Sequence, residues 1–178
     1  LRRLLCLAAM LLVPLAAAAQ SPANVWTPIG PQFSTVLSMA RNPVAPNVLY
    51  AGMYFGGLYR SDDYGFSWTP VATEFSPRSI FSIAVSSNGA TVYVATFQGG
   101  VYRSADGGTT WAAVNTGLTD LDVQAVGVDP ANGDIAVAAT GNGGVFRTSN
   151  GGASWNRVDR AAQNLRGKTI AFHPTIAG

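Results

Sequence analysis

The sequence predicts an all-β fold built from short repeated units, and three observations lead to that prediction. The four tryptophans are spaced 42, 43 and 44 residues apart, at Trp26, Trp68, Trp111 and Trp155. A similar segment ends at each of the last three tryptophans: GGLYRSDDYGFSW from Gly56, GGVYRSADGGTTW from Gly99 and GGVFRTSNGGASW from Gly143. Runs rich in Val, Ile, Tyr, Phe and Thr dominate the chain, and no long segment keeps a helical period.

Each repeat contains four candidate strands. Two β-rich runs precede the recurring text in every unit, namely VLSMA with VLYAGMY, IFSIAV with TVYVATF, and VQAVGV with DIAVAAT. The segments between the paired runs, NPVAPN, SSNGA and DPANG, are rich in turn-forming residues. A unit of about 43 residues with four short strands has the size of one β-propeller blade. We therefore expect four-stranded antiparallel blades at about residues 34–72, 79–115 and 122–159.

The recurring turn follows the pattern S/T-x-D/N-x-G-x-S/T-W. The three copies are Ser61, Asp63, Gly65, Ser67 and Trp68; Ser104, Asp106, Gly108, Thr110 and Trp111; and Thr148, Asn150, Gly152, Ser154 and Trp155. This pattern is the Asp box, or BNR repeat, and the chain resembles the propellers that carry it. They include sortilin-type receptors, photosystem II assembly-factor propellers, sialidases and xyloglucan-degrading hydrolases. Three copies in register make the resemblance specific, although a single copy would be weak evidence.

The residue types of the box suit a tight hairpin between the third and fourth strands of a blade. Asp63 and Asp106 can accept backbone N–H groups of the turn, whereas Asn150 keeps the carbonyl acceptor but loses the charge. The box glycines suit a position that needs a positive φ. The tryptophan can then fold over the turn and bury apolar surface. The resemblance implies that the boxes lie at the outer base of the propeller, so we expect a structural role for them.

Both ends of the predicted repeat region look like parts of further blades. Residues 25–30 contain Trp26-Thr27-Pro28-Ile29, a close copy of the text from Trp68, and are predicted to be an outer strand. Residues 168–173 read as the first strand of another unit. Since propellers usually have four to eight blades, about three complete blades predict an incomplete ring. We expect a fragment of a longer protein, with a ring closed by several copies as the alternative.

Residues 1–19 have the pattern of a signal peptide. Arg2 and Arg3 precede an apolar run, and small alanines precede Gln20. We expect residues 20–178 to be secreted or periplasmic, with no membrane span after cleavage; a retained N-terminal anchor is the alternative. Without the two arginines, nine basic residues balance nine acidic ones, so no nucleic-acid partner is indicated. The only cysteine, Cys6, lies in the predicted signal peptide.

The sequence predicts no catalytic, cofactor-binding or metal-binding residues. His173 is the only histidine, and Asp62 with Asp63 is too small an acidic group for a calcium loop. Propeller geometry places the loops between second and third strands, and between consecutive blades, on the face opposite the boxes. The candidate ligand-face residues there are Phe55, Phe75, Arg78 and Phe97. The alternative for the phenylalanines is packing between blades.

Two functions remain open at this point. The first is a secreted, non-catalytic propeller that binds a protein or a glycan, or acts as a scaffold. The second is the N-terminal part of a sialidase-like or xyloglucanase-like glycoside hydrolase, with its catalytic residues mostly outside this chain. The F/Y-R-I-P element of sialidases is absent between Gln20 and Ser61, and nothing pairs the carboxyls of Glu74, Asp120 and Asp122. The residues therefore favour a binding protein over an enzyme.

Overall fold

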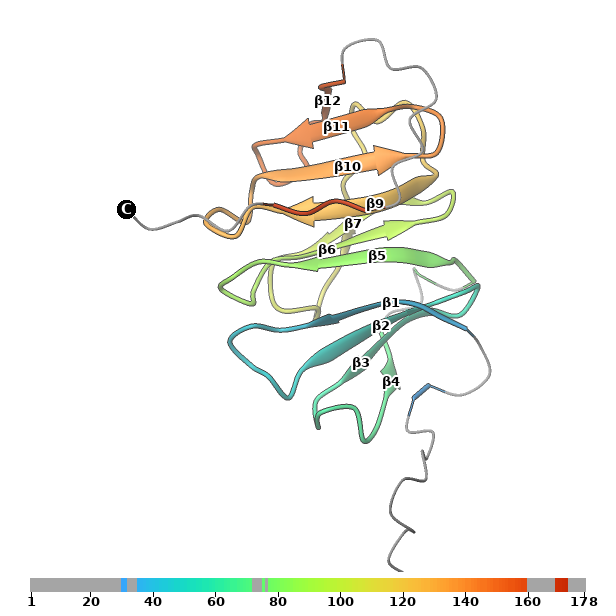
Figure 1. Ribbon diagram of the computed structural model, residues 1–178, viewed down its shortest axis with the longest axis vertical. Coiled ribbons are helices and arrows are strands. Elements are labelled where there is room, and N and C mark those ends of the chain that lie inside the picture. Colours follow the sequence, from blue (N-terminus) through green and yellow to red (C-terminus); the bar gives the residue numbers. More distant parts are fainter. Residues whose placement is uncertain (1–29, 32–34, 72–74, 76, 160–168, 173–178) are drawn as a thin grey trace, which may run out of the picture.

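The computed structural model describes residues 30–31, 35–71, 75, 77–159 and 169–172. Within these residues twelve strands form three four-stranded antiparallel sheets, and no α-helix is assigned. The sheets lie one after another along the molecule and do not close into a ring (Figure 1). This arrangement confirms the predicted all-β fold of four-stranded blades in an incomplete ring.

We call the sheets blades 1, 2 and 3 in chain order. Blade 1 contains β1 (Val36–Arg41), β2 (Leu49–Met53), β3 (Gly57–Ser61) and β4 (Thr69–Pro70). Blade 2 contains β5 (Ile80–Val85), β6 (Val92–Thr96), β7 (Gly100–Ser104) and β8 (Ala112–Ala113). Blade 3 contains β9 (Val123–Val128), β10 (Ala136–Thr140), β11 (Val145–Thr148) and β12 (Asn156–Arg157).

The predicted signal peptide and nearly all of the predicted outer strand at 25–30 lie outside the described residues. Of the predicted first strand at 168–173, residues 169–172 are described, and no strand is assigned to them. They nevertheless run along β9, because a Cβ at Gly127 would lie only 2.7 Å from Ile170 Cγ2.

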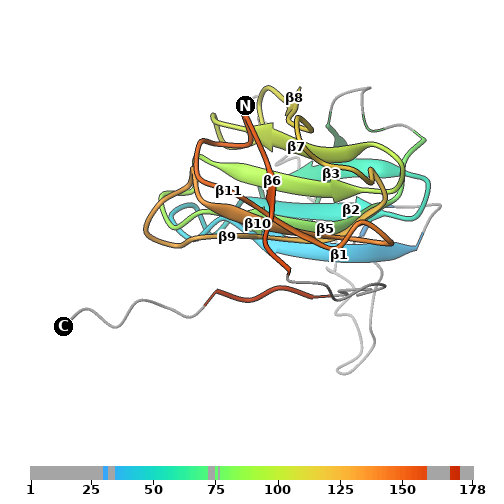
Figure 2. The same cartoon turned by 90° about the horizontal axis from the view of Figure 1, so that it is seen from above.

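The first strands of the blades lie along one side of the molecule, and the outer strands lie on the other (Figure 2). Strand β5 contacts both β1 and β9, so the blades are joined mainly through their inner strands. Every blade has a register shift between its first and second strands, at Val36/Ser38, Ile80/Ser82 and Ala139/Thr140. These β-bulges lie where the hairpins between second and third strands begin, and bulges bend a strand locally. Since the bulge has the same position in each blade, the hairpins between second and third strands begin at equivalent places in all three blades.

The hydrophobic core lies between the blades. Between blades 1 and 2, Tyr50, Leu58 and Phe75 pack against Ile80, Val92 and Val94. Between blades 2 and 3, Tyr93 and Val101 pack against Val123, Val126, Ala136, Ala138 and Trp155. Full burial of one large apolar side chain contributes about 1.5–3 kcal/mol. Each blade therefore depends on its neighbour for much of its stability.

Candidate functional site

The first Asp-box turn is closed by hydrogen bonds among its own residues. Ser61 Oγ donates to Asp63 Oδ1 at 2.7 Å and accepts the Gly65 N–H at 2.8 Å. Asp63 Oδ1 also accepts the Ser67 N–H at 2.8 Å, and Asp63 Oδ2 accepts the Ser67 hydroxyl at 2.5 Å. These bonds, led by that of the Ser67 hydroxyl, lower the pKa of Asp63 to about 2. The Trp68 indole N–H donates back to Gly65 O at 3.0 Å.

The second box repeats this geometry. Ser104 Oγ donates to Asp106 at 2.8 Å and accepts the Gly108 N–H at 2.8 Å. The Thr110 N–H and hydroxyl donate to the Asp106 carboxylate at 2.9 and 2.7 Å. These bonds, with the backbone bond of Thr110 first, hold the pKa of Asp106 far below its usual range. The Trp111 indole N–H donates to Gly108 O at 3.1 Å.

The third box keeps the turn without a charge. Thr148 Oγ1 donates to Asn150 Oδ1 at 2.8 Å and accepts the Gly152 N–H at 2.9 Å. Asn150 accepts the Ser154 N–H at 3.0 Å and donates its own amide to Ser154 Oγ at 2.9 Å. The Asn150 amide thus takes the place of the carboxylate in the other two boxes. It donates to the Ser154 hydroxyl, whereas Asp63 and Asp106 accept from the hydroxyls of Ser67 and Thr110.

The tryptophan of the third box has different partners. Its indole N–H donates to Val114 O at 2.7 Å, and its backbone N–H donates to Thr116 O at 2.8 Å. Both acceptors belong to the end of blade 2. Trp155 is therefore buried between two blades, whereas Trp68 and Trp111 are half-buried over their own turns.

Two consecutive residues of each box have a left-handed backbone. The box glycines Gly65, Gly108 and Gly152 have φ of 91°, 85° and 87°. The residues before them are Tyr64, Gly107 and Gly151, with φ of 62°, 66° and 70°. Only the first box thus has a side chain at the earlier position, where L-residues are strained. Apart from the bonds of Trp155 to blade 2, these contacts lie within the turns, and the structural role of the boxes stays a prediction.

The opposite ends of the blades carry the hairpins between second and third strands. These hairpins are hydrogen-bonded to the connections that lead from one blade to the next. The Gly57 N–H donates to Arg78 O at 3.0 Å, the Gly100 N–H to Leu121 O at 2.9 Å, and the Gly141 N–H to Asp122 O at 2.7 Å. We call this end of the molecule the hairpin face.

Aromatic side chains cluster on the hairpin face of blades 1 and 2. Phe55 meets Tyr54 edge-to-face at 4.6 Å between ring centroids and Phe97 at 6.3 Å, and Phe97 meets Phe81 at 6.0 Å. Tyr54 is 52% exposed and Phe55 50% exposed. We call Tyr54, Phe55, Phe81 and Phe97 the aromatic cluster. Tyr54 and Phe81 were missed from the sequence, although Tyr54 adjoins Phe55 at the hairpin tip.

The tips that carry this cluster have unusual backbone geometry. Phe55 and Gln98 have positive φ values of 50° and 56°, which is uncommon for residues other than glycine. The Phe55 N–H is held by the buried Ser79 Oγ at 2.9 Å. Arg78 Nη1 donates to Gln98 O at 2.9 Å, so this arginine braces the second tip. The two tips are therefore fixed in place by side chains of the connection between the blades.

One predicted ligand-face residue lies elsewhere. Phe75 is fully buried and packs against Tyr102 at 5.0 Å and Trp111 at 5.1 Å between ring centroids. Of the two expectations for this residue, packing between blades is therefore the one that applies, because the connection turns the side chain into the joint between blades 1 and 2.

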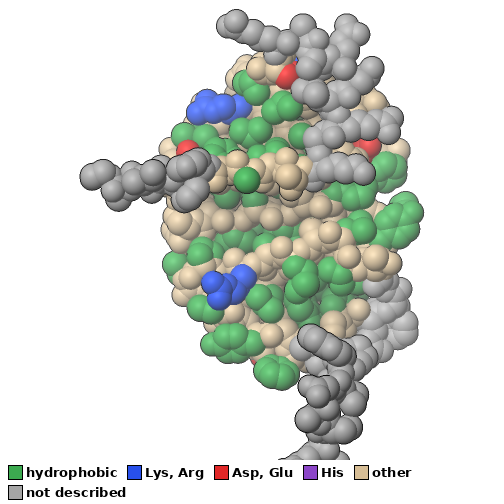
Figure 3. Space-filling model, in the orientation of Figure 1, with side chains coloured by type: hydrophobic (Ala, Val, Ile, Leu, Met, Phe, Trp, Pro, Cys, Tyr) green, Lys and Arg blue, Asp and Glu red, His purple; other side chains and the backbone are tan. Residues whose placement is uncertain are grey.

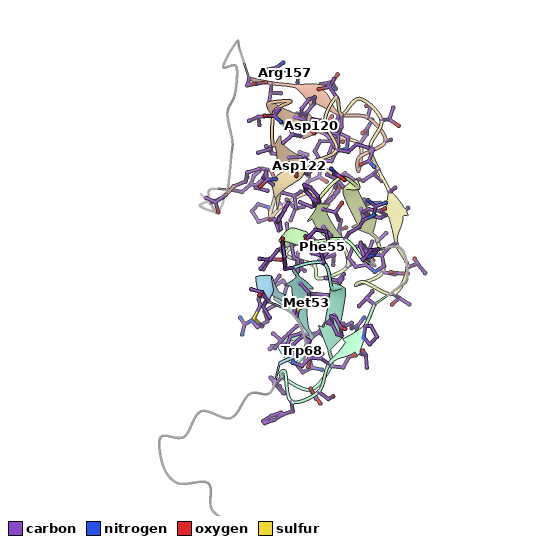
Figure 4. All side chains as sticks on the ribbon, turned by 90° about the vertical axis from the view of Figure 1, so that its right-hand side faces the viewer. Met53, Phe55, Trp68, Asp120, Asp122 and Arg157 are labelled. Atoms are coloured by element: carbon purple, nitrogen blue, oxygen red, sulfur yellow. The ribbon has the colours of Figure 1, made fainter. Side chains whose placement is uncertain are left out.

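Carboxylates lie on the hairpin face beside blade 3, in the connection that leads into it from blade 2. Figure 4 views the molecule from this side, with Phe55, Asp122 and Asp120 labelled. Asp120 accepts the N–H groups of Asp122 at 2.9 Å and of Asn142 at 2.7 Å, and its second oxygen also accepts the Gly143 N–H at 3.2 Å. Asp122 accepts the Gln124 amide at 2.7 Å. Both oxygens of Asp120 thus bind backbone and fix the blade 3 hairpin.

The described residues contain no group of three or more His, Cys, Asp or Glu side chains that could hold a metal ion. In the same part of the chain, no helix has the length and apolar character to cross a membrane.

Comparisons with known proteins agree with this architecture. A family model described as sortilin, neurotensin receptor 3, matches residues 99–177, which is less than half of the chain. A search of curated proteins finds no match.

Solved propellers are similar in structure. YCF48 from Cyanidioschyzon merolae is 22% identical with a TM-score of 0.58, over 69% of this chain and 36% of that one. An ancestral GH74 enzyme is 25% identical with a TM-score of 0.63, over 74% of this chain and 19% of that one. A structure of YCF48 bound to D1 peptide is 19% identical with a TM-score of 0.63, over 78% and 46%. The chain spans less than half the length of each of these structures.

The fold and the boxes together define the class of protein. Three blades of four antiparallel strands, each with the box motif at its third hairpin, make this chain an Asp-box type of β-propeller arc. The resemblance to sortilin-type, assembly-factor and glycosidase-like propellers is confirmed at the level of this fold.

Proposed function

We propose that this chain is part of a secreted, non-catalytic propeller that binds a protein or a glycan through its hairpin face. The observation that carries the proposal is the aromatic cluster, in which Tyr54 and Phe55 are exposed and whose hairpin tips are held by Ser79 and Arg78. Secretion rests on the signal-peptide pattern of residues 1–19.

The geometry of the cluster suits binding. Exposed aromatic side chains dominate the energetics of recognition surfaces, and rigid ones lose little conformational entropy when a ligand binds. Strained backbone at a surface tip is often found at functional sites. Phe55 and Gln98 combine this strain with hydrogen bonds that hold it. Among the similar structures, one is YCF48 bound to a peptide and another is a GH74 enzyme, which supports a peptide or a carbohydrate as the class of ligand.

The carboxylates on this face support binding rather than hydrolysis. A glycoside hydrolase needs one carboxyl to protonate the leaving oxygen and a second to act as base or nucleophile. Asp120 accepts three backbone N–H groups, so its oxygens are engaged in holding the blade 3 hairpin.

The test compares two aromatic surfaces of the same molecule. In the Phe55→Ala/Phe97→Ala variant, binding to immobilised xyloglucan or to a displayed random-peptide library should fall at least about tenfold, as expected for anchor residues. Phe66→Ala is the matched control, because Phe66 is 75% exposed at the first box, at the other end of blade 1. Equal binding by the double variant and the control would contradict the proposal. Release of soluble sugar from xyloglucan would instead favour the hydrolase.

A further inference from the structure

The two joints between blades are built from equivalent residues. The receiving side is the first and second strands of the later blade together with its box tryptophan. In blade 2 this side includes Ile80, Val92 and Val94, and in blade 3 it includes Val123, Ala136 and Ala138; all six are buried. Each receiving side is covered by the preceding blade, and we call it the acceptor flank.

Among the described residues, no other blade covers the acceptor flank of blade 1. In the strand register, Val36 pairs with Met53, Ile80 with Thr96 and Val123 with Thr140. Each is the first-strand residue paired with the last residue of the second strand, so the three positions are equivalent. Yet Val36 is 40% exposed, and the neighbouring Met39 is 59% exposed. A cavity of about 250 Å³ lies here, lined almost entirely by apolar atoms of Gly30, Pro31, Val36, Met39, Leu49, Ala51, Tyr64, Gly65 and Trp68. Hydrophobic side chains gather over this blade in the space-filling view (Figure 3).

The closed joints show which side chains fill the acceptor flank. Tyr50 donates its hydroxyl across the joint to Gly107 O at 2.6 Å, and Tyr93 donates to Gly133 O at 2.9 Å. The Tyr50 ring lies so close to the second box that a Cβ at Gly108 would be 2.8 Å from it. Burial raises the pKa of both phenols, which keeps them protonated as donors.

An arginine accompanies each of these tyrosines. Arg60 pairs with Tyr50 across strands β2 and β3, and Arg103 pairs with Tyr93 across β6 and β7. Arg60 Nη1 donates to the same Gly107 O at 2.9 Å, while Arg103 Nη2 donates to Asp134 Oδ1 at 2.9 Å. Every closed joint therefore combines a cross-strand Tyr–Arg pair with the turns of the next blade.

We propose that the acceptor flank of blade 1 is a binding site for the Tyr–Arg edge of a further blade of this type, from outside residues 36–159. The tyrosine ring fills the cavity beside Trp68 and Met39. Its hydroxyl and the arginine donate to the backbone of the first box turn, where Tyr64 stands in the place of Gly107.

The edge of blade 3 does not match this requirement, which argues against a second copy as the occupant. Its cross-strand pair at the equivalent position is Val137 with Arg147, so the tyrosine is missing. Ile170 also lies against Gly127 of β9, so residues 169–172 already pack beside blade 3. The occupant is therefore a different blade with a tyrosine at this position.

The experiment uses p-cresol, which is the tyrosine side chain as a free molecule, and the whole chain labelled with ¹⁵N. We expect a saturable shift of the Trp68 indole resonance. The indole resonances of Trp111 and Trp155 should not move, because their flanks are already filled. A charge placed in an apolar wall opposes binding, so Met39→Glu and Val36→Glu should each weaken p-cresol binding at least about tenfold. Val158→Glu is the control, since Val158 is 49% exposed in blade 3.

Three results would overturn the proposal. One is the absence of a saturable Trp68 shift in the folded wild-type chain. Another is equal p-cresol affinity in Met39→Glu, Val36→Glu and the Val158→Glu control. The third is a Trp68 shift that grows with protein concentration alone, together with protection of Met39 from peroxide. In that case a second copy fills the flank, and the buried Met53 provides the internal reference for the oxidation.

Discussion

The second and third Asp boxes have nearly the same sequence pattern, but their tryptophans have different hydrogen-bond partners. In the second box the Trp111 indole donates to Gly108 O of its own turn, while Tyr50 and Arg60 of blade 1 donate to Gly107 O from outside. The third box is bonded into blade 2 through both the indole and the backbone of Trp155. Correspondingly, Trp155 is only 3% exposed while Trp111 is half-buried.

The difference shows that the motif determines the turn but not the partner of its tryptophan. Gly117 lies in the connection after blade 2 with φ of 93°, and any side chain there would collide with the Trp155 carbonyl. This glycine lets the connection approach the third box. Phe75 occupies the corresponding joint at the second box, where it packs on the Trp111 ring. The same tryptophan therefore acts as a lid over its turn or as a bridge between blades, depending on the neighbouring connection.

The largest expected effect separates the two tryptophans. Trp155→Ala should lower the free energy of unfolding by about 3–5 kcal/mol, as truncation of a fully buried aromatic does. Trp111→Ala should cost less, because its ring is half-exposed and its hydrogen bond is local. Urea unfolding of both variants measures the difference. Equal losses would mean that the bridge to Val114 contributes nothing beyond the turn.

The charge difference between the boxes should appear in acid. The folded pKa of Asp63 is about 2, below the ordinary value of 3.8, and that of Asp106 is lowered as well. The unfolded chain then binds protons more readily than the folded one. The two ionised carboxylates therefore stabilise the fold fully above their ordinary pKa, and this stabilisation disappears as the pH falls toward 2. The Asp63→Asn/Asp106→Asn variant should therefore lose less stability than the wild type between pH 5 and pH 2.

The matched control for this acid test is Asn150→Asp, which should steepen the same pH dependence. Free energies of unfolding measured along the pH series provide the comparison. A double variant with the wild-type pH dependence would show that the box carboxylates are not the groups that titrate.

The smallest expected effect concerns the strained position before the box glycine. Tyr64 has φ of 62° where the other two boxes have glycine. Tyr64→Gly should raise the free energy of unfolding by about 0.5–1 kcal/mol, since relief of left-handed strain exceeds the added entropy of the unfolded glycine. Gly107→Ala should lower it by about 1 kcal/mol for the converse reason. Chemical denaturation measures both, and a loss of stability in Tyr64→Gly would show that the tyrosine side chain contributes more than its backbone costs.

Much of the fold could be predicted because its determinants are repeated and local. The hydrogen bonds within each box join residues at most four positions apart, from Ser61 to Gly65 or from Asp63 to Ser67. The candidate ligand face was predicted less well. Phe55 and Phe97 lie on it, but Phe75 is buried and Tyr54 and Phe81 were missed. The direction of a side chain in a connection depends on the blade beyond it, and no local pattern records that.

By itself, the sequence determined the repeat, the four-stranded blade and the chemistry of the turns, because hydrogen-bonding side chains and left-handed positions act within a few residues. Only the tertiary structure decided how blades join. Tyr50 reaches Gly107 across 57 positions, and Trp155 reaches Val114 across 41. Such contacts arise when apolar flanks of separate sheets exclude water together, and the same packing leaves the flank of blade 1 without a partner among the described residues.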